Sequence, residues 1–143
     1  MGNYISRTDV QDRLQRTYTT LYTVSGSVDT DKVDQDIAGA EAEIDGYVAT
    51  RYAVPVTGDA VALLKDLALA LAEERAYRRA PNLDMPGKIA DAAKTARAQL
   101  RDIAAGRMSL GAATVPDERS AATGAMVIDA ETPEYTRDKL AGW

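Results

Sequence analysis

The chain has 143 residues, enough for one ordinary domain, and 45% of them are apolar. It contains neither Cys nor His, which excludes disulfides, thiolate metal sites, cysteine nucleophiles and every catalytic triad that needs an imidazole. The net charge of −5 argues against a dedicated nucleic-acid binder, and no apolar run is long enough to predict a membrane-spanning helix.

The first predicted helix covers roughly residues 8–22. Thr8 is its expected N-cap, with Gln11 in the capping-box position three residues later. Residues 25–27, Ser-Gly-Ser, then predict a loop. Apolar residues recur within the helix at three- and four-residue intervals, at Val10, Leu14, Tyr18 and Leu21.

The second helix has the clearest signals. It is expected to begin at Asp29 or Thr30, where a capping side chain precedes an acidic first turn. Pro55 ends the helical pattern, and residues 53–56 predict a short extended linker. One apolar stripe, which indicates core packing, consists of Val33, Ile37, Ala40, Ile44, Tyr47, Val48 and Tyr52.

Two more helices follow. The third is predicted over residues 59–80, with Asp59 as its N-cap. Its Ala and Leu residues cover nearly the whole circumference, which is typical of a central, buried helix. The fourth is predicted over residues 86–105, with a narrower apolar stripe and with Gly106 as its C-terminal cap.

The composition changes after residue 107, where Gly, Ala, Thr, Ser and Pro become frequent and helical stripes disappear. We interpret residues 1–107 as a helical bundle and residues 108–143 as an extended arm in which residues 124–128 form a short strand. Such an arm buries little surface for each residue that it fixes, so we expect it to become ordered against another subunit. Docking of the arm on its own bundle is the alternative. The predicted fold is all-α, a four-helix bundle with an extended C-terminal arm.

None of the acidic or glycine-containing segments has the residue spacing of a known reactive site. The acidic residues from Asp29 to Asp36 lack the spacing of a calcium loop and fit an acidic first helical turn. Glu73 and Glu74 point about 100° apart on a helix, so they do not form a facing acid pair. No glycine motif for phosphates occurs. We therefore predict no catalytic residue, no metal ligand and no cofactor. An enzyme that uses only carboxylates is the alternative.

Charge is distributed unevenly along the chain. Residues 1–64 carry ten acids and five bases, whereas residues 65–107 carry nine bases and six acids. We expect Arg97 and Arg101 to form part of a basic patch that meets the acidic half of a neighbouring copy. An ordinary solvated helix surface is the alternative. The same basic stretch leaves open a small helical DNA-binding regulator.

Residues 36–48, which read D-I-A-G-A-E-A-E-I-D-G-Y-V, lead directly into residues 51–56, R-Y-A-V-P-V. This combination resembles the phage Mu Gp36-like family of small head–tail joining proteins. The segments 101–111 and 135–140 resemble the family's next helix end and its terminal arm. The segment 17–28 matches the family poorly, and the arm's aromatic residue is a tyrosine here.

The resemblance implies an adaptor in the virion, made in the cytoplasm of the bacterial host. Such proteins form a homo-oligomeric ring, usually twelvefold, between the portal and the neck or tail-completion protein. DNA passes through the ring without sequence-specific binding, and no membrane is involved. On this basis we assign Arg51, Tyr52 and Pro55 to the fold. We expect the contacts with the portal or a neighbouring subunit to come from Met126, Val127, Ile128, Tyr135, Arg137, Leu140 and Trp143.

Overall fold

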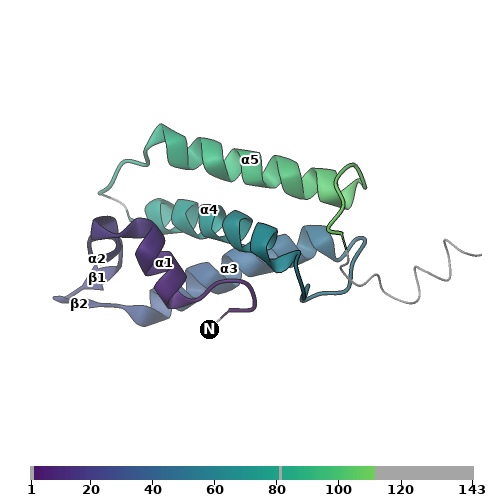
Figure 1. Ribbon diagram of the computed structural model, residues 1–143. Coiled ribbons are helices and arrows are strands. Elements are labelled where there is room, and N and C mark those ends of the chain that lie inside the picture. The colour runs from purple at the N-terminus through teal and green to yellow at the C-terminus, as the bar shows by residue number, and fades with distance from the viewer. Residues whose placement is uncertain (1, 81, 112–143) are drawn as a thin grey trace, which may run out of the picture.

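The computed structural model describes residues 2–80 and 82–111. Within these ranges the chain forms five helices and one two-stranded hairpin (Figure 1). The prediction of a mainly helical protein is confirmed, but the predicted arrangement of four helices is not what is observed. The elements, in chain order, are α1 (Arg7–Leu14), α2 (Arg16–Tyr22), β1 (Thr23–Val24), β2 (Ser27–Val28), α3 (Thr30–Val48), α4 (Val61–Arg79) and α5 (Gly87–Ala104).

Helix α4 is the centre of the molecule, because it contacts α1, α2, α3 and α5. Most of its length between Leu64 and Ala76 is buried, which confirms the prediction of a central helix. Its first turn differs from the prediction: the N-cap is Ala60, which provides no side-chain cap, so Asp59 does not cap the helix. The helix is held by burial of its apolar faces on several sides and does not depend on a capping side chain.

The N-terminal helical segment differs from the prediction in two ways. The N-cap is Ser6 and not Thr8, and a capping box joins the side chains and backbone N–H groups of Ser6 and Asp9. The helix then breaks at Gln15, whose φ of 50° is incompatible with a continuous α-helix. The prediction of one helix over residues 8–22 is therefore wrong, and two short helices, α1 and α2, stand in its place.

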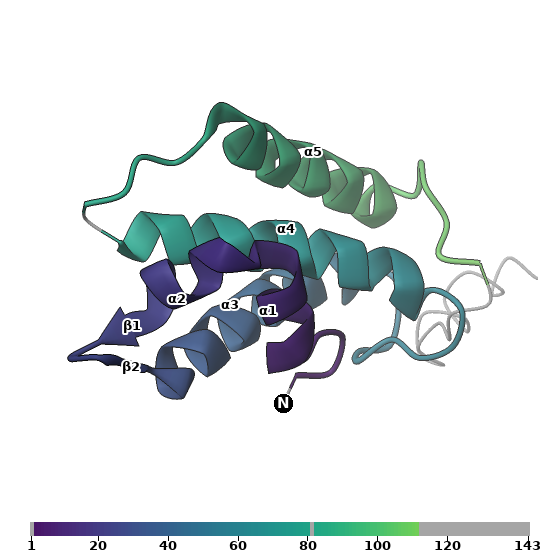
Figure 2. The same ribbon diagram turned by 60° about the vertical axis from the view of Figure 1, so that its left-hand side comes forward.

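The predicted loop at residues 25–27 is instead the tip of a hairpin. Strands β1 and β2 pair antiparallel, with Thr23 opposite Val28. Ser25 and Gly26 form the two-residue turn, and both have positive φ, as a type I′ turn requires. The hairpin projects at the end of the molecule where α4 finishes (Figures 1 and 2).

The long helices begin and end close to their predicted positions. Asp29 caps α3, as one of the two predicted candidates, by accepting the N–H groups of Asp31 and Lys32. Helix α5 ends at Ala104, and Gly106 follows with a φ of 80°, which confirms its predicted role at the C-terminal cap.

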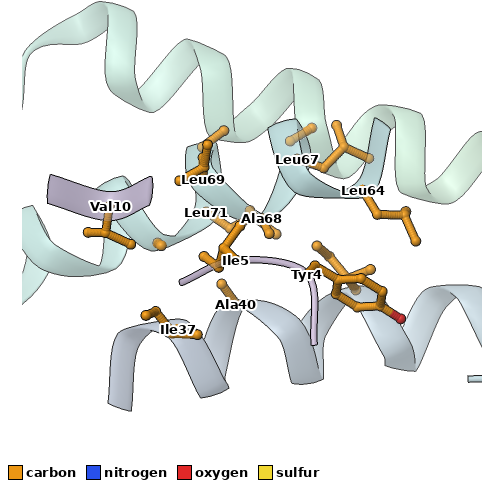
Figure 3. Close-up of a cluster of buried hydrophobic side chains, with 14 of the residues drawn as sticks. Tyr4, Ile5, Val10, Ile37, Ala40, Leu64, Leu67, Ala68, Leu69 and Leu71 are labelled. Atoms are coloured by element: carbon orange, nitrogen blue, oxygen red, sulfur yellow. The ribbon is translucent and has the colours of Figure 1, made fainter. Parts of the chain in front are cut away.

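The core lies between α3, α4 and α5 and also takes in the N-terminal segment. Figure 3 shows Ile5 between Ala40 of α3 and Ala68 of α4. Tyr4 and Ile5 are both buried although they belong to no helix. The segment before α1 is therefore part of the packed domain. None of the helices in the described ranges combines the length and the apolarity needed to cross a membrane.

Candidate functional site

The last described residues pack against one end of the bundle. The α3–α4 connection and the end of α5 lie together there, opposite the hairpin (Figure 2). We call residues 105–111, together with Arg51 and Tyr52, the arm root, because the predicted arm continues from Gly111. Residues 112–143 follow the arm root in the sequence.

Tyr52 attaches the arm root to the end of α3. Its ring is buried, and its hydroxyl oxygen accepts the N–H of Leu110 at 3.2 Å. Leu110 is buried as well and belongs to the main core cluster. The Leu110 N–H stabilises the phenolate form, and this effect exceeds the opposing effect of burial, so the pKa of Tyr52 lies below its usual value. Residues 108–110 are thus part of the folded bundle.

Arg51 holds the other side of the arm root. Its guanidinium lies where a Cβ of residue 106 would stand, so a side chain at this position would require the exposed Arg51 to move. The Gly106 N–H donates to Ile103 and the Arg107 N–H donates to Asp102, which closes the last turn of α5. A cation at a helix C-terminus also interacts favourably with the helix dipole. Arg51 therefore lies against the last turn of α5 at Gly106.

We expect Gly106→Ala to lower the free energy of unfolding by about 1–2 kcal/mol, because alanine resists the left-handed backbone and its methyl group would displace Arg51. Gly58→Ala is the matched control: its φ of 86° is similar, but no atom lies within 4 Å of the added Cβ. Urea unfolding of both variants measures the difference. Equal losses for the two variants would contradict an energetic cost of displacing Arg51.

The N-terminal segment is bound at the same domain by a buried carboxylate. Glu41 accepts the backbone N–H groups of Asn3 (2.8 Å), Tyr4 (2.7 Å) and Ile5 (3.0 Å). The Tyr4 hydroxyl donates to Asp45 and accepts the N–H of Val56 at 3.0 Å. Burial and these carboxylates raise the pKa of Tyr4 well above its usual value. The segment before α1 thereby ties α3 to the α3–α4 connection.

An ion-pair network joins the three long helices. Arg97 of α5 reaches Glu43 of α3 and Glu74 of α4, both at 2.6 Å. Arg75 binds Glu43 at 3.1 Å, and Arg78 binds Glu74 at 2.8 Å. The Glu74 side chain is only 6% exposed, so loss of these arginines would leave a buried carboxylate without a partner. The network fixes the relative positions of α3, α4 and α5.

The network makes stability depend on acid pH. Burial alone would raise the pKa of Glu43, but the hydrogen bonds from Arg97 and Arg75 outweigh it, so the pKa lies below 4.5. Because the folded pKa is depressed, the stabilisation is complete above pH 4.5 and is lost as the pH falls through the folded value. We expect the urea concentration at the unfolding midpoint to decrease as the pH is lowered from 4.5. In Glu43→Gln this decrease with pH should be less steep.

Asp34 gives a control for this pH experiment. The hydrogen bond from Arg7 lowers its pKa as well, but both side chains are more than a third exposed. Salt should therefore remove the contribution of Asp34 and leave most of that of Glu43. At about 0.5 M salt the screening length is about 4–5 Å. If this salt concentration removed the pH dependence of the wild-type urea midpoint completely, the role of Glu43 would be contradicted.

The predicted site residues lie in different environments in the structure. Arg97 is engaged inside its own subunit, whereas Arg101 is exposed and makes no ion pair with any residue in the described ranges. A contact between subunits at these two positions stays a prediction. Tyr52 is buried and Pro55 exposed. The predicted arm residues lie outside the described ranges: Met126, Val127, Ile128, Tyr135, Arg137, Leu140 and Trp143.

Sequence reasoning missed the buried carboxylates. Glu41, Glu74 and Asp36 are each less than a tenth exposed. The signal for Glu41 was its position in the apolar stripe of α3, one residue after Ala40 and three before Ile44. An acid at such a position has to find buried donors. Nothing in the sequence indicated that these donors would be backbone groups of the N-terminal segment.

The described residues offer no group of three metal-ligating side chains. The three buried acids are bound within the bundle: Glu41 to backbone N–H groups, Glu74 to Arg78 and Arg97, and Asp36 to Tyr22 and Arg79. The polar groups therefore serve packing and the attachment of chain segments. Fold and site together define a small, mainly helical protein whose buried polar groups are structural.

Residues 4–129 match the family model described as "Bacteriophage Mu, Gp36". This match covers most of the chain, and the protein belongs to that family. The family is one of phage structural proteins. No curated protein matches the chain.

Proposed function

We propose that this protein is a head–tail connector: an adaptor that forms a ring, predicted to be twelvefold, between the portal and the neck or tail-completion protein of a tailed phage or a phage-like particle. In this role it completes the head, lines the channel through which DNA passes and recognises no DNA sequence. Membership of a phage structural family supports a virion component.

The observation that supports the proposal most is the arm root. Tyr52 and Leu110 attach the chain to the bundle immediately before Gly111. Residues 112–143 continue from this fixed point and contain the apolar group Met126-Val127-Ile128 and the terminal Trp143. A rigid body that presents a separate binding segment suits an adaptor, which has to join a neighbour or the portal.

The charges of the described domain speak against the alternative, a DNA-binding regulator. Within the basic stretch 75–107, carboxylates of the same subunit bind Arg75, Arg78, Arg79, Arg97 and Arg107. Lys88, Lys94 and Arg101 are the exposed cations left on α5, and Asp91 lies among them. A duplex-binding face normally needs a larger, unpaired basic surface.

The test is the mass of the purified protein, alone and mixed with the portal of the same phage, by native mass spectrometry. We expect a closed ring of copies on the portal. A parallel titration with duplex DNA over a salt series tests the regulator. If the protein did not bind the portal but bound DNA tightly at physiological salt, the connector function would be rejected in favour of a DNA-binding regulator.

A further inference from the structure

A groove of about 370 Å³ lies at the end of the molecule opposite the arm root. Its lining residues come from α2, the hairpin, α3, the end of α4 and the α4–α5 connection. Figures 1 and 2 show the hairpin and the end of α4 at the same end of the molecule. Leu21, Val24 and Leu83 give it an apolar part, and Lys32 and Arg79 give it a cationic part. Val24 is 42% exposed, and in the described ranges Val54 is the other exposed large apolar residue.

The cationic part of the groove consists of Arg79, whose side chain is held by its neighbours, and Lys32, whose side chain is free to turn. Arg79 is bound to Asp36 and lies over the ring of Tyr22, with 5.4 Å between the guanidinium carbon and the ring centroid. Tyr22 in turn donates its hydroxyl to Asp36 at 2.8 Å, so Arg79 is held in place. Lys32 stands 3.9 Å from Asp29, at the outer limit of an ion pair, and its side chain is 36% exposed. Lys32 can therefore turn towards a second carboxylate.

The arm contains one segment with complementary chemistry. Residues 126–131 read M-V-I-D-A-E: three consecutive large apolar residues and then two acids, with no base among them. In an extended segment Met126 and Ile128 lie on the same side, as one apolar pair. We propose that this segment of a neighbouring copy binds in the groove, with its apolar pair against Val24 and its acids near Lys32. The inference rests on the proposed function, in which arms join subunits.

The positions of the groove and the arm root favour a neighbouring copy over the chain's own arm. The two sites lie at opposite ends of the 19-residue helix α4, about 28 Å apart along its axis. Residues 112–125 could span that distance at about 3.3 Å per residue. Apart from Val24 and Val54, however, no large apolar side chain is exposed in the described ranges, so a returning arm would be fixed over polar surface at an entropic cost.

The same arrangement suits a ring. Each subunit would donate its arm from one end and receive an arm at the other, so that every copy makes the same heterologous contact with the next. A contact of this kind repeats until the rotation closes. In such a ring each subunit would carry two different and complementary binding elements, the groove and the segment 126–131.

Cross-linking tests the proposal, because the chain has no cysteine of its own. Two full-length proteins with different tags are mixed, one carrying Val24→Cys and the other Ile128→Cys. The mixture is oxidised under two conditions: at high concentration without the portal, and bound to the portal. Val54→Cys is the matched control, since Val54 has the same side chain and 39% exposure. We expect mixed disulfides from Val24→Cys in at least one condition, on the order of tenfold above the control, as for apposed rather than random thiols.

A charge variant checks the acidic half of the contact. Lys32→Glu in the Val24→Cys protein should reduce the mixed disulfide about two- to fivefold, as expected for one exposed charge pair. The substituted residue lies in the first turn of α3, where an acid is tolerated by the helix dipole.

Three results would overturn the proposal. The first is a yield from Val24→Cys no higher than that from Val54→Cys, both alone and on the portal. The second is a double variant, Val24→Cys with Ile128→Cys, whose two cysteines form a disulfide only within single chains. The third is a yield that Lys32→Glu leaves unchanged. Portal binding by the wild-type protein is read separately, so a failed groove contact is distinguished from a failed connector role.

Discussion

Replacement of Glu41 by alanine is expected to lower the free energy of unfolding by about 3 kcal/mol. The Glu41 carboxylate accepts three backbone N–H groups, and alanine would leave those of Tyr4 and Ile5 buried without a partner. The N-terminal segment would then detach, and the core would lose the side chains of Tyr4 and Ile5. Urea unfolding followed by far-UV circular dichroism measures the loss.

Glu41→Gln is the matched control for this prediction. Glutamine keeps one side-chain oxygen, which can accept the N–H groups of Tyr4 and Ile5, but its NH₂ group cannot accept from Asn3. We therefore expect a loss of about 1 kcal/mol, the usual value of one hydrogen bond. If alanine and glutamine destabilised the protein equally, the carboxylate would not bind the segment in the way described.

Charge reversal should affect Arg97 and Arg101 very differently. Arg97→Glu would place a third carboxylate beside Glu43 and Glu74, and the loss of stability should reach about 3 kcal/mol. Arg101→Glu changes an exposed side chain that has no ion-pair partner in the described ranges, and should stay within about 0.5 kcal/mol. Thermal or urea unfolding of the two variants compares them directly.

This difference decides which arginine can report on assembly. A failure of Arg97→Glu to assemble would follow from damage to the subunit and would say nothing about the interface. Arg101→Glu keeps the fold, so weaker assembly at low salt would support its predicted contact with a neighbour. Unchanged assembly of Arg101→Glu at low salt would remove that contact, and equal stability of the two variants would contradict the network around Arg97.

Much of the fold could be predicted because the long helices carry redundant signals. Asp29 caps α3, Pro55 follows its end, and Gly106 closes α5. The central position of α4 followed from apolar residues on all its sides. Two features gave no comparable signal. Gln15 breaks the first helix without any Gly or Pro nearby, and strands of two residues are too short to show an alternating pattern.

The site was less predictable, since it depends on contacts between distant segments. Tyr52 is buried, as its assignment to the fold predicted, whereas Arg51 is exposed and its assignment stays a prediction. Their contacts with Leu110 and Gly106 could not be read from the chain. Arg97 looked like a surface charge because its helical position is polar. Only the packing of α5 on α3 and α4 brings it to two carboxylates. Helical spacing describes one helix at a time and not what faces it.

The central claim is that the bundle is the body of a connector and that the arm makes its contacts. The most direct measurement is the mass of complexes formed with the cognate portal by the full-length protein and by a variant cut after Gly111. Tyr52 and Leu110 remain in the shortened chain, so its bundle should stay folded, as circular dichroism will check. We expect full-length protein to form a closed ring on the portal and the shortened protein to remain unbound. A folded, shortened protein that binds as well as the full chain would contradict the claim.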